Sequence, residues 1–584
     1  MRNGFTLIEL LAVIVILAII ALIATPIILG IINDAKEEAN KRSIDNYAKA
    51  VQNSIVKHQL NNSINITGKF SPKKLENNKL SKTIITNKSS ELKIEYDGDV
   101  ICDTVIINKD GSIYISDCLV NGSKVDYSYG KRMYGVLSNV NGSGGTFLNT
   151  GISRRSISLL NLHDKIEIPE GYQFSDCSIS EDESVMCWWK ESEQYSNYYE
   201  MHIGSEGVIY APEDSSHLFW EIGRFKYEKD TLDLTNLDTS NVTNMAFMFS
   251  YTGHNNLVSL DLGDKFDTSN VTNMAFMFSD TGFDSMISLD LGDKFDTSKV
   301  TNMSKMFSNT GYTSMKELDL GDKFDTSNVT NMEKMFCQTG YTKLINLDLG
   351  DKFDTSNVTN MAFMFSYTGH NNLVSLNLGD KFDTSKVTNM SGMFQATGYV
   401  SMKELDLGDK FDTSSVTYMN HMFYEFGHDK LVSLNLGDKF DTSNVNSMQS
   451  MFELAGANSM KELDLGDKFD TSNVTNMSQM FRYTGYSSMI SLDLGDKFRT
   501  TEKTRNVSNM FEGTGQESMT ELNLGKFGKS FYTYASKSNI FTNCGTEGVL
   551  TKVIVEDESY KTWLESETSV PEFWLNNNII QIDN

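Results

Sequence analysis

A 29-residue repeat constrains this chain more than any other feature of its sequence. Phenylalanine recurs at this interval at Phe266, Phe295, Phe324, Phe353, Phe382, Phe411, Phe440, Phe469 and Phe498. One unit of this length cannot bury its own apolar face, but neighbouring units that stack on each other can. The repeats therefore predict a solenoid, roughly 50 Å long if its strands are spaced as in a sheet.

Each unit has two halves with different apolar patterns. In residues 286–311, the first half carries Met286, Leu289 and Leu291, which fit the L-x-x-L-x-L strand of a leucine-rich repeat. The second half has apolar residues at i, i+3, i+6 and i+7, a spacing typical of one face of a short helix. These residues are Val300, Met303, Met306 and Phe307. The pattern predicts strands alternating with short helices.

The sequence motif of the repeat resembles that of a known family. The segment Phe-Asp-Thr-Ser-x-Val-Thr-Asn-Met-x-x-Met-Phe, together with its lead-in at residues 210–219, resembles the BspA-type leucine-rich repeats of bacterial surface proteins over about residues 205–545. The resemblance implies display on a cell surface and adhesion to host matrix proteins or to other bacteria. It does not identify the ligand.

The N-terminus is apolar over the length of a membrane span. The apolar run extends from Leu10 to Ile32, which is long enough to cross a bilayer as a helix. Glu9 lies at its start, and an ionisable residue in such a segment suggests a function. No helix breaker follows the apolar run before about His58, so we expect one helix over residues 5–58.

The first residues resemble the class III leader junction of type IV pilins and pseudopilins. They read Gly4-Phe5-Thr6-Leu7-Ile8-Glu9. The resemblance implies that prepilin peptidase cuts after Gly4 and that Phe5 becomes the methylated N-terminal residue. Glu9 would pair with the new amino terminus of a neighbouring subunit, which offsets the cost of burying its charge. Pro26 falls where these pilins often carry a kink, and the alternative to this interpretation is an uncleaved signal anchor.

The expected fold class is α+β, with a long pilin-like helix and a small antiparallel β head followed by a β/α leucine-rich-repeat solenoid. The predicted divisions are a leader (1–4), a transmembrane and assembly helix (5–58), a β head (59–135), a linker (136–149), a β-rich module and repeat cap (150–225), the repeats (226–545) and a C-terminal cap (546–584). The head is expected from short apolar runs that alternate with turns.

Four of the six cysteines lie on either side of turns. Cys102 and Cys118 flank two apolar runs around an Asp-Gly turn, which would place them nearly opposite each other in a hairpin. Cys177 and Cys187 flank an acidic turn in the same way. Because export permits disulfides, both pairs are candidate disulfides, and the alternative is buried free thiols.

One face of the predicted sheet is acidic. Side chains alternate along a strand, so the residue between inward leucines is displayed. The candidate binding residues on this face are Asp261, Asp290, Asp319, Asp348, Asp406, Asp464 and Asp493. Carboxylates about 5 Å apart repel by roughly 1 kcal/mol or less per pair in water. The row is therefore a solvated face, a calcium site or a binding face for a basic or polar protein.

Charge and motifs exclude several functions. A net charge of −26 argues against nucleic acid and anionic lipid as partners. The sequence has no His-Glu-x-x-His motif, no phosphate loop and no dinucleotide fingerprint. We therefore expect no enzyme activity, no catalytic residues, no cofactor and no metal site.

Together these features predict a minor or tip pilin that displays its repeats for adhesion or protein binding. Its partners would be other pilin subunits, prepilin peptidase, the cytoplasmic membrane before assembly and an unidentified host or bacterial surface protein. Its location would be the cell surface or an extracellular pilus. The alternative is a membrane-anchored receptor or scaffold that is not assembled into pili.

The assembly role of Glu9 is open to a direct test. The substitution Glu9→Ala removes the partner of the neighbouring amino terminus, so the protein should remain in the membrane but be lost from sheared filaments. Immunoblots of the membrane and sheared fractions measure this. Unchanged incorporation would count against assembly through Glu9.

Overall fold

The computed structural model describes residues 32–33, 35–58, 68–87, 90–107, 112–130, 135–138, 146–148, 150–179, 183–292, 294–321, 323–528 and 530–583. The described residues form two compact units. One contains the residues up to Ser138 together with Asp176–Met186, and the other contains those of Asn139–Ser175 and Cys187–Asn584.

The first unit is a helix packed on an antiparallel sheet. The helix covers residues 35–58, and the strand order is β3-β2-β1-β4-β5-β6. The strands are β1 (Gly68–Lys74), β2 (Leu80–Thr86), β3 (Glu91–Lys93), β4 (Val100–Ile107), β5 (Ile113–Val120) and β6 (Ser123–Val125). Ile44, Tyr47, Val51 and Ile55 recur on one helix face and join the sheet residues in one buried core.

The expected hairpin around Cys102 and Cys118 is present. These residues are direct partners in the antiparallel register of β4 and β5, and they form a disulfide. Their side chains are fully buried in the core of the unit. The covalent link therefore ties together two adjacent strands that already pack against the helix.

A four-stranded sheet of order β7-β10-β9-β8 precedes the repeats in the chain. Its strands are β7 (Ile157–His163), β8 (Gln173–Asp176), β9 (Val185–Glu191) and β10 (Tyr199–Ser205), and a short 3-10 helix, η1 (Arg154–Ser156), precedes them. β7 and β10 are parallel. Arg154 is buried and donates hydrogen bonds to the carbonyls of His217 and Leu218, where the first coil of the solenoid begins.

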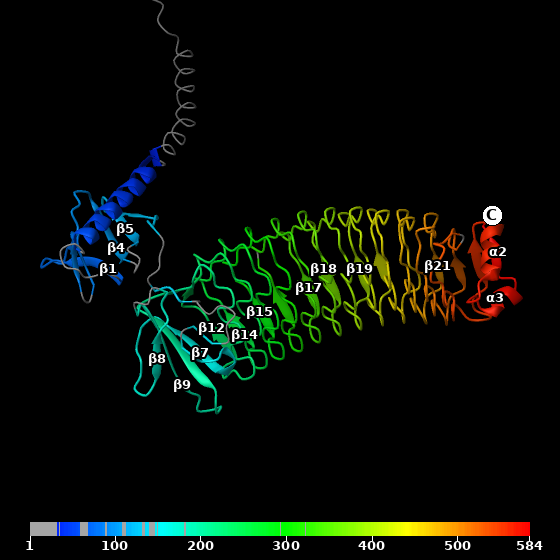
Figure 1. Cartoon of the computed structure of the whole chain (residues 1–584), viewed down its shortest axis with the longest axis horizontal. Coiled ribbons are helices and arrows are strands. Elements are labelled where there is room, and N and C mark those ends of the chain that lie inside the picture. The colour runs from blue at the N-terminus through cyan, green and yellow to red at the C-terminus, as the bar shows by residue number, and fades with distance from the viewer. Residues whose placement is uncertain are drawn as a thin grey trace, which may run out of the picture. The chain divides into compact units, whose positions relative to one another are not determined.

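The repeats form stacked coils, which Figure 1 shows in succession from β12 to β21. Most coils contribute a strand of two or three residues, and the paired strands are parallel and in register, as in Leu289 opposite Leu318. The strands are β11 (Ile209–Tyr210), β12 (Thr231–Asp233), β13 (Leu237–Asp238), β14 (Ser259–Asp261), β15 (Ser288–Asp290), β16 (Glu317–Asp319), β17 (Asn346–Asp348), β18 (Ser375–Asn377), β19 (Glu404–Asp406), β20 (Ser433–Asn435), β21 (Ser491–Asp493) and β22 (Glu521–Asn523).

The second half of each repeat is a series of turns and not a helix. Within one coil, the N–H of Met306 donates to the carbonyl of Met303, and Thr310 donates to Phe307 in the same way. The alternate N–H groups bond the next coil, as from Lys305 to Glu333 at 2.8 Å. Thus every second backbone group connects neighbouring coils, which an α-helix would not allow because it satisfies its backbone internally.

The predicted α+β fold with a β/α leucine-rich-repeat solenoid is therefore wrong. The described structure is mostly a β-solenoid with a few short helices. Val300, Met303, Met306 and Phe307 are all fully buried, as expected from their spacing. Inward-facing residues of a turn series and of a helix recur at similar intervals, so the apolar pattern alone did not distinguish the two. Lys305 and Asn309 have φ of 56° and 60°, as type II turns require at their third residue.

Aromatic stacks and threonine hydroxyls complete the core. Phe278, Phe307 and Phe336 stack with ring centroids 5.5–5.6 Å apart. The buried hydroxyl of Thr297 donates to the carbonyl of Asp325 in the next coil, and the hydroxyl of Thr310 donates to that of Phe278 in the previous one. These bonds recur along the array and satisfy polar groups that would otherwise be costly to bury.

A cap closes the C-terminal end of the array. β23 (Lys552–Val555) and β24 (Ile580–Ile582) extend the parallel sheet from β22. The helices α2 (Glu558–Ser566) and α3 (Glu572–Asn576) lie in the same segment, shown in red in Figure 1. Trp574 is fully buried against Phe541. The last phenylalanine of the stack is therefore covered by protein.

Most of the residues that carry the membrane-related predictions lie outside the part of the chain that the structure describes. No helix among the described residues combines the length and the apolar character needed to span a membrane. Gly4, Phe5, Glu9 and Pro26 lie outside the described residues, as does the span over residues 5–31.

The turn series makes a prediction that separates it from a helix. Gln479 has φ of 60°, and glycine occupies the same repeat position at Gly392 with φ of 61°. The substitution Gln479→Gly relieves a strain of about 1–2 kcal/mol and costs about 0.5–1 kcal/mol of backbone entropy, so it should leave the coil as stable or more stable. In a helix the same change would cost about 1 kcal/mol.

Amide hydrogen exchange across residues 477–484 measures the effect on this coil. The matched variant Gln479→Val places a β-branched residue at positive φ and should speed exchange about tenfold or more. Faster exchange in Gln479→Gly than in the parent would refute the turn geometry.

Candidate functional site

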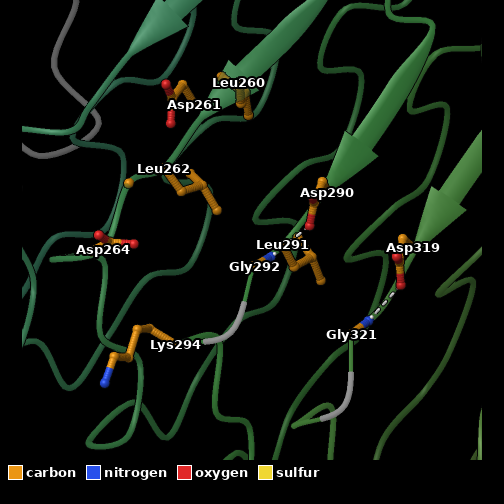
Figure 2. A pocket seen from close by; sticks show the side chains of 11 residues that line it. Leu260, Asp261, Leu262, Asp264, Asp290, Leu291, Gly292, Lys294, Asp319 and Gly321 are labelled. Carbon is orange, nitrogen blue, oxygen red and sulfur yellow. Dashed lines mark hydrogen bonds between the residues drawn. The ribbon is translucent and has the colours of Figure 1, made fainter.

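The predicted acidic row lies on the exposed face of the solenoid sheet. Asp261, Asp290 and Asp319 end successive three-residue strands and are exposed, whereas the leucine before each of them is buried. Figure 2 shows these three carboxylates on the same side of neighbouring strands. Asp348, Asp406 and Asp493 end later strands, and Asp464 occupies the same repeat position in a segment without an assigned strand. All seven predicted residues therefore share one face.

Most of these carboxylates have a local structural role. Asp290 accepts a hydrogen bond from the N–H of Gly292 at 2.8 Å, and Asp319 accepts one from Gly321 at 2.9 Å, as the dashed lines in Figure 2 show. The same bond is made by Asp348, Asp406, Asp464 and Asp493. Each is an Asx-type turn that leads into a glycine with positive φ, such as Gly292 at 73°.

Asparagine interrupts the row and reduces its repulsion. Asn377 donates to the carboxylate of Asp348 at 3.2 Å, and Asn435 donates to that of Asp406 at 3.1 Å. Both asparagines also accept the glycine N–H of their own coil. The amide therefore replaces the carboxylate in the turn and adds a donor toward the neighbouring carboxylate.

Shallow hollows lie along this face. One is lined by Asp261, Leu262, Asp264, Asp290, Lys294 and Asp319, shown in Figure 2, and has a volume of about 640 Å3. In the described part of the chain, no group of three or more His, Cys, Asp or Glu side chains is placed to hold a metal ion. Chemically, the face offers acidic oxygens and lysines to a polar partner.

The remaining cysteines divide into bonded and free. Cys177 and Cys187 are both disulfide-bonded, as predicted. Cys337 and Cys544 are free. Burial raises the pKa of the Cys337 thiol to about 11, although the nearby ammonium groups of Lys334 and Lys305 act in the opposite direction. Burial also raises the pKa of Cys544. Neither thiol is poised as a nucleophile.

Sequence reasoning missed a row of stacked rings on the turn segments. It comprises His254, Phe283, Tyr312, Tyr341, His370, Tyr399 and His428, whose neighbouring centroids are 4.5–4.7 Å apart. Burial lowers the pKa of His370 within this row. The signal was available, because an aromatic or histidine residue follows Thr-Gly or Phe-Gly in each of these repeats.

A histidine pair near the start of the second unit was also missed. Nε2 of His163 lies 2.9 Å from Nδ1 of His202, and both rings stack with Trp188. Burial lowers the pKa of both histidines, and the charge of His163 lowers the pKa of His202 further, although Glu200 acts in the opposite direction. Glu200 accepts a hydrogen bond from Tyr172 beside them. The two strands β7 and β10 bring this pair together, which spacing along the chain does not reveal.

Residues 216–336, 311–425 and 398–523 match the family described as "Mycoplasma protein of unknown function, DUF285", and together these matches span more than half of the chain. The chain belongs to this family. The DUF285 region coincides with the solenoid coils, so the family's repeats and the observed β-solenoid describe the same segment. The match supports a repeat surface protein and does not identify the repeats as BspA-type.

A second match concerns the N-terminus of this DUF285 protein. Residues 1–25 match the prokaryotic N-terminal methylation motif. The match supports a prepilin-type N-terminus and a pilin-like surface protein in the general context of pilus assembly. The chain has no significant match among curated proteins or among solved structures.

The carboxylates of the sheet face predict a specific mutational pattern. Asp348→Asn keeps the acceptor for Gly350, so it should change the unfolding free energy by less than about 0.5 kcal/mol, whereas Asp348→Ala leaves that N–H without its partner and should cost about 1 kcal/mol. Thermal melts with calcium or with chelator should coincide. If Asp348→Asn is as damaging as Asp348→Ala and calcium raises the melting temperature, the carboxylates hold a cation.

Proposed function

We propose that this protein is a minor or tip pilin that displays its β-solenoid for adhesion through protein binding. The observation that carries the proposal is the fusion of a methylation-motif N-terminus to a long repeat array in one chain. A head of this size would be difficult to place on every subunit of a tight filament. A minor or tip position removes that difficulty.

The first unit supports the pilin part of the proposal. Its helix over residues 35–58 presents an apolar face to an antiparallel sheet. In the proposal, the helix continues from an N-terminal segment that prepilin peptidase cuts after Gly4 and that other pilin subunits contact through Glu9. The protein would reside in the cytoplasmic membrane before assembly and at the cell surface or in an extracellular pilus afterwards.

The repeats support the adhesion part. A solenoid offers long surfaces on which the same chemical groups recur at regular intervals, and such surfaces favour avid contacts with an extended partner. The acidic balance of the chain disfavours nucleic acid as that partner. We propose a host or bacterial surface protein as the partner and no catalytic activity.

Filament fractionation tests the pilin assignment. An epitope inserted in the C-terminal cap should appear in sheared filaments, and immunogold labelling should be sparse or confined to tips. In a strain without prepilin peptidase, the same epitope should stay in the membrane fraction. Retention in the membrane despite an active peptidase would instead support an anchored receptor or scaffold.

Adhesion is tested separately with whole filaments. Sheared filaments from the parent strain should bind immobilised host or bacterial surface proteins at least severalfold more than filaments from a strain that lacks this chain. Equal binding by the two preparations would refute a role in adhesion.

A further inference from the structure

Some positions of the repeat keep the same type of residue from one coil to the next, and others change. The strand-end position is Asp or Asn in each coil from Asp261 to Asn523. By contrast, one position of the turn series changes from coil to coil. Its residues are Phe247, Phe276, Lys305, Lys334, Phe363, Gly392, His421, Ser450 and Gln479. Variation at one position of a regular scaffold can give each coil a different contact, which the uniform strand-end position cannot.

A groove follows this variable position over the first coils. Its lining includes Trp220, Phe247, Phe276, Lys305, Asn309 and Lys334, and its volume is about 500 Å3. His217, Phe247 and Phe276 stack in succession, with centroids 4.6 and 4.3 Å apart. The aromatic row then stops, and lysines occupy the next two coils.

Each of the two lysines lies beside an aromatic ring of a neighbouring coil. Nζ of Lys305 lies 4.6 Å from the ring centroid of Phe276, and Nζ of Lys334 lies 5.3 Å from that of Phe363. Within the described residues, neither ammonium group forms an ion pair with a carboxylate. The lysines are thus available to an external anion.

Asp280 and Asn309 also line the groove. Asp280 accepts hydrogen bonds from the hydroxyl of Ser279 and from the amide of Asn309, the latter at 3.1 Å. The bond to Asp280 fixes the orientation of the Asn309 amide. The other end of that amide, Oδ1, is buried without a partner among the described residues.

We propose that this groove is the partner-binding site of the solenoid and that it takes an acidic polypeptide segment; this rests on the proposed function. Aspartate or glutamate side chains of the segment supply anions for Lys305 and Lys334. The apolar stems of its side chains contact the edges of Phe247, Phe276 and Trp220.

Two observations favour a polypeptide over an acidic saccharide. Sugar rings stack on open aromatic faces, but Phe276 lies between Phe247 and Lys305, and the guanidinium of Arg224 lies 4.2 Å from the ring centroid of Tyr251. Aromatic side chains such as those that remain in the groove are enriched at protein interfaces. The carboxylate of Asp280 also lines the groove, where it accepts the hydrogen bonds of Ser279 and Asn309. Charges more than about 8 Å from the lysines are largely screened at physiological salt.

Binding of short probes tests the proposal on the full-length protein in detergent. Fluorescein-labelled octaglutamate should bind at physiological ionic strength, and octaserine should not. The double variant Lys305→Gln/Lys334→Gln should weaken octaglutamate binding about tenfold or more. The charge-preserving double variant Lys305→Arg/Lys334→Arg should retain most of it, which separates loss of charge from loss of fold.

A matched control uses two lysines outside the groove. Lys299 and Lys386 bond Asn270 and Asn357 in their preceding coils. The double variant Lys299→Gln/Lys386→Gln removes the same charge and should change affinity less than twofold. Equal losses in the two Gln pairs, no binding of octaglutamate, or binding of an alginate oligosaccharide in its place would each overturn the proposal.

The same variants separate this proposal from the proposed function. If filaments carrying Lys305→Gln/Lys334→Gln adhere as well as the parent, the groove is not the adhesive site although the protein is an adhesin. If the parent protein never enters filaments or never contributes to adhesion, the proposed function fails whatever the probes show.

Discussion

The hydrogen bonds between successive coils are the interaction on which the repeat domain depends. In the turn series, alternate backbone groups close turns within a coil and the others bond the next coil, as Met303 bonds Asn331 and Phe307 bonds Met335. A single coil would leave half of these groups without partners. The array is stable only because each coil completes its neighbours, and its ends therefore need covers such as the buried Trp574.

This constraint explains which side chains can change. A position is fixed where its side chain fills the interior or closes a backbone turn, as Phe307 and Asp290 do. At the position of Lys305 the backbone alone makes the connections to the next coil, and the side chain points into a groove. Phenylalanine, lysine, glycine and histidine can therefore alternate there without breaking the stack.

The sequence allowed some features to be predicted and not others. The period, the inward residues and the hairpin of Cys102 and Cys118 follow from spacing, because a repeat cannot bury its apolar residues without stacking and a short turn leaves few possible registers. The helix was wrongly expected because Val300, Met303, Met306 and Phe307 face inward in either geometry. The positive φ of Lys305 and Asn309 distinguishes the turn series from a helix, and it could not be predicted from these residue types.

The acidic row shows the same limit for function. Its exposure was predictable from strand alternation, but the glycine N–H that most of these carboxylates accept was not, since it depends on the turn that follows the strand. A carboxylate that closes a turn is retained in each coil for the fold, so its recurrence is weak evidence for a ligand. The turn-series groove depends on contacts between coils, such as that of Lys305 with Phe276, which one repeat read alone does not contain. Specific recognition by a solenoid is therefore best sought at positions that the fold leaves free, such as that of Lys305 on the turns.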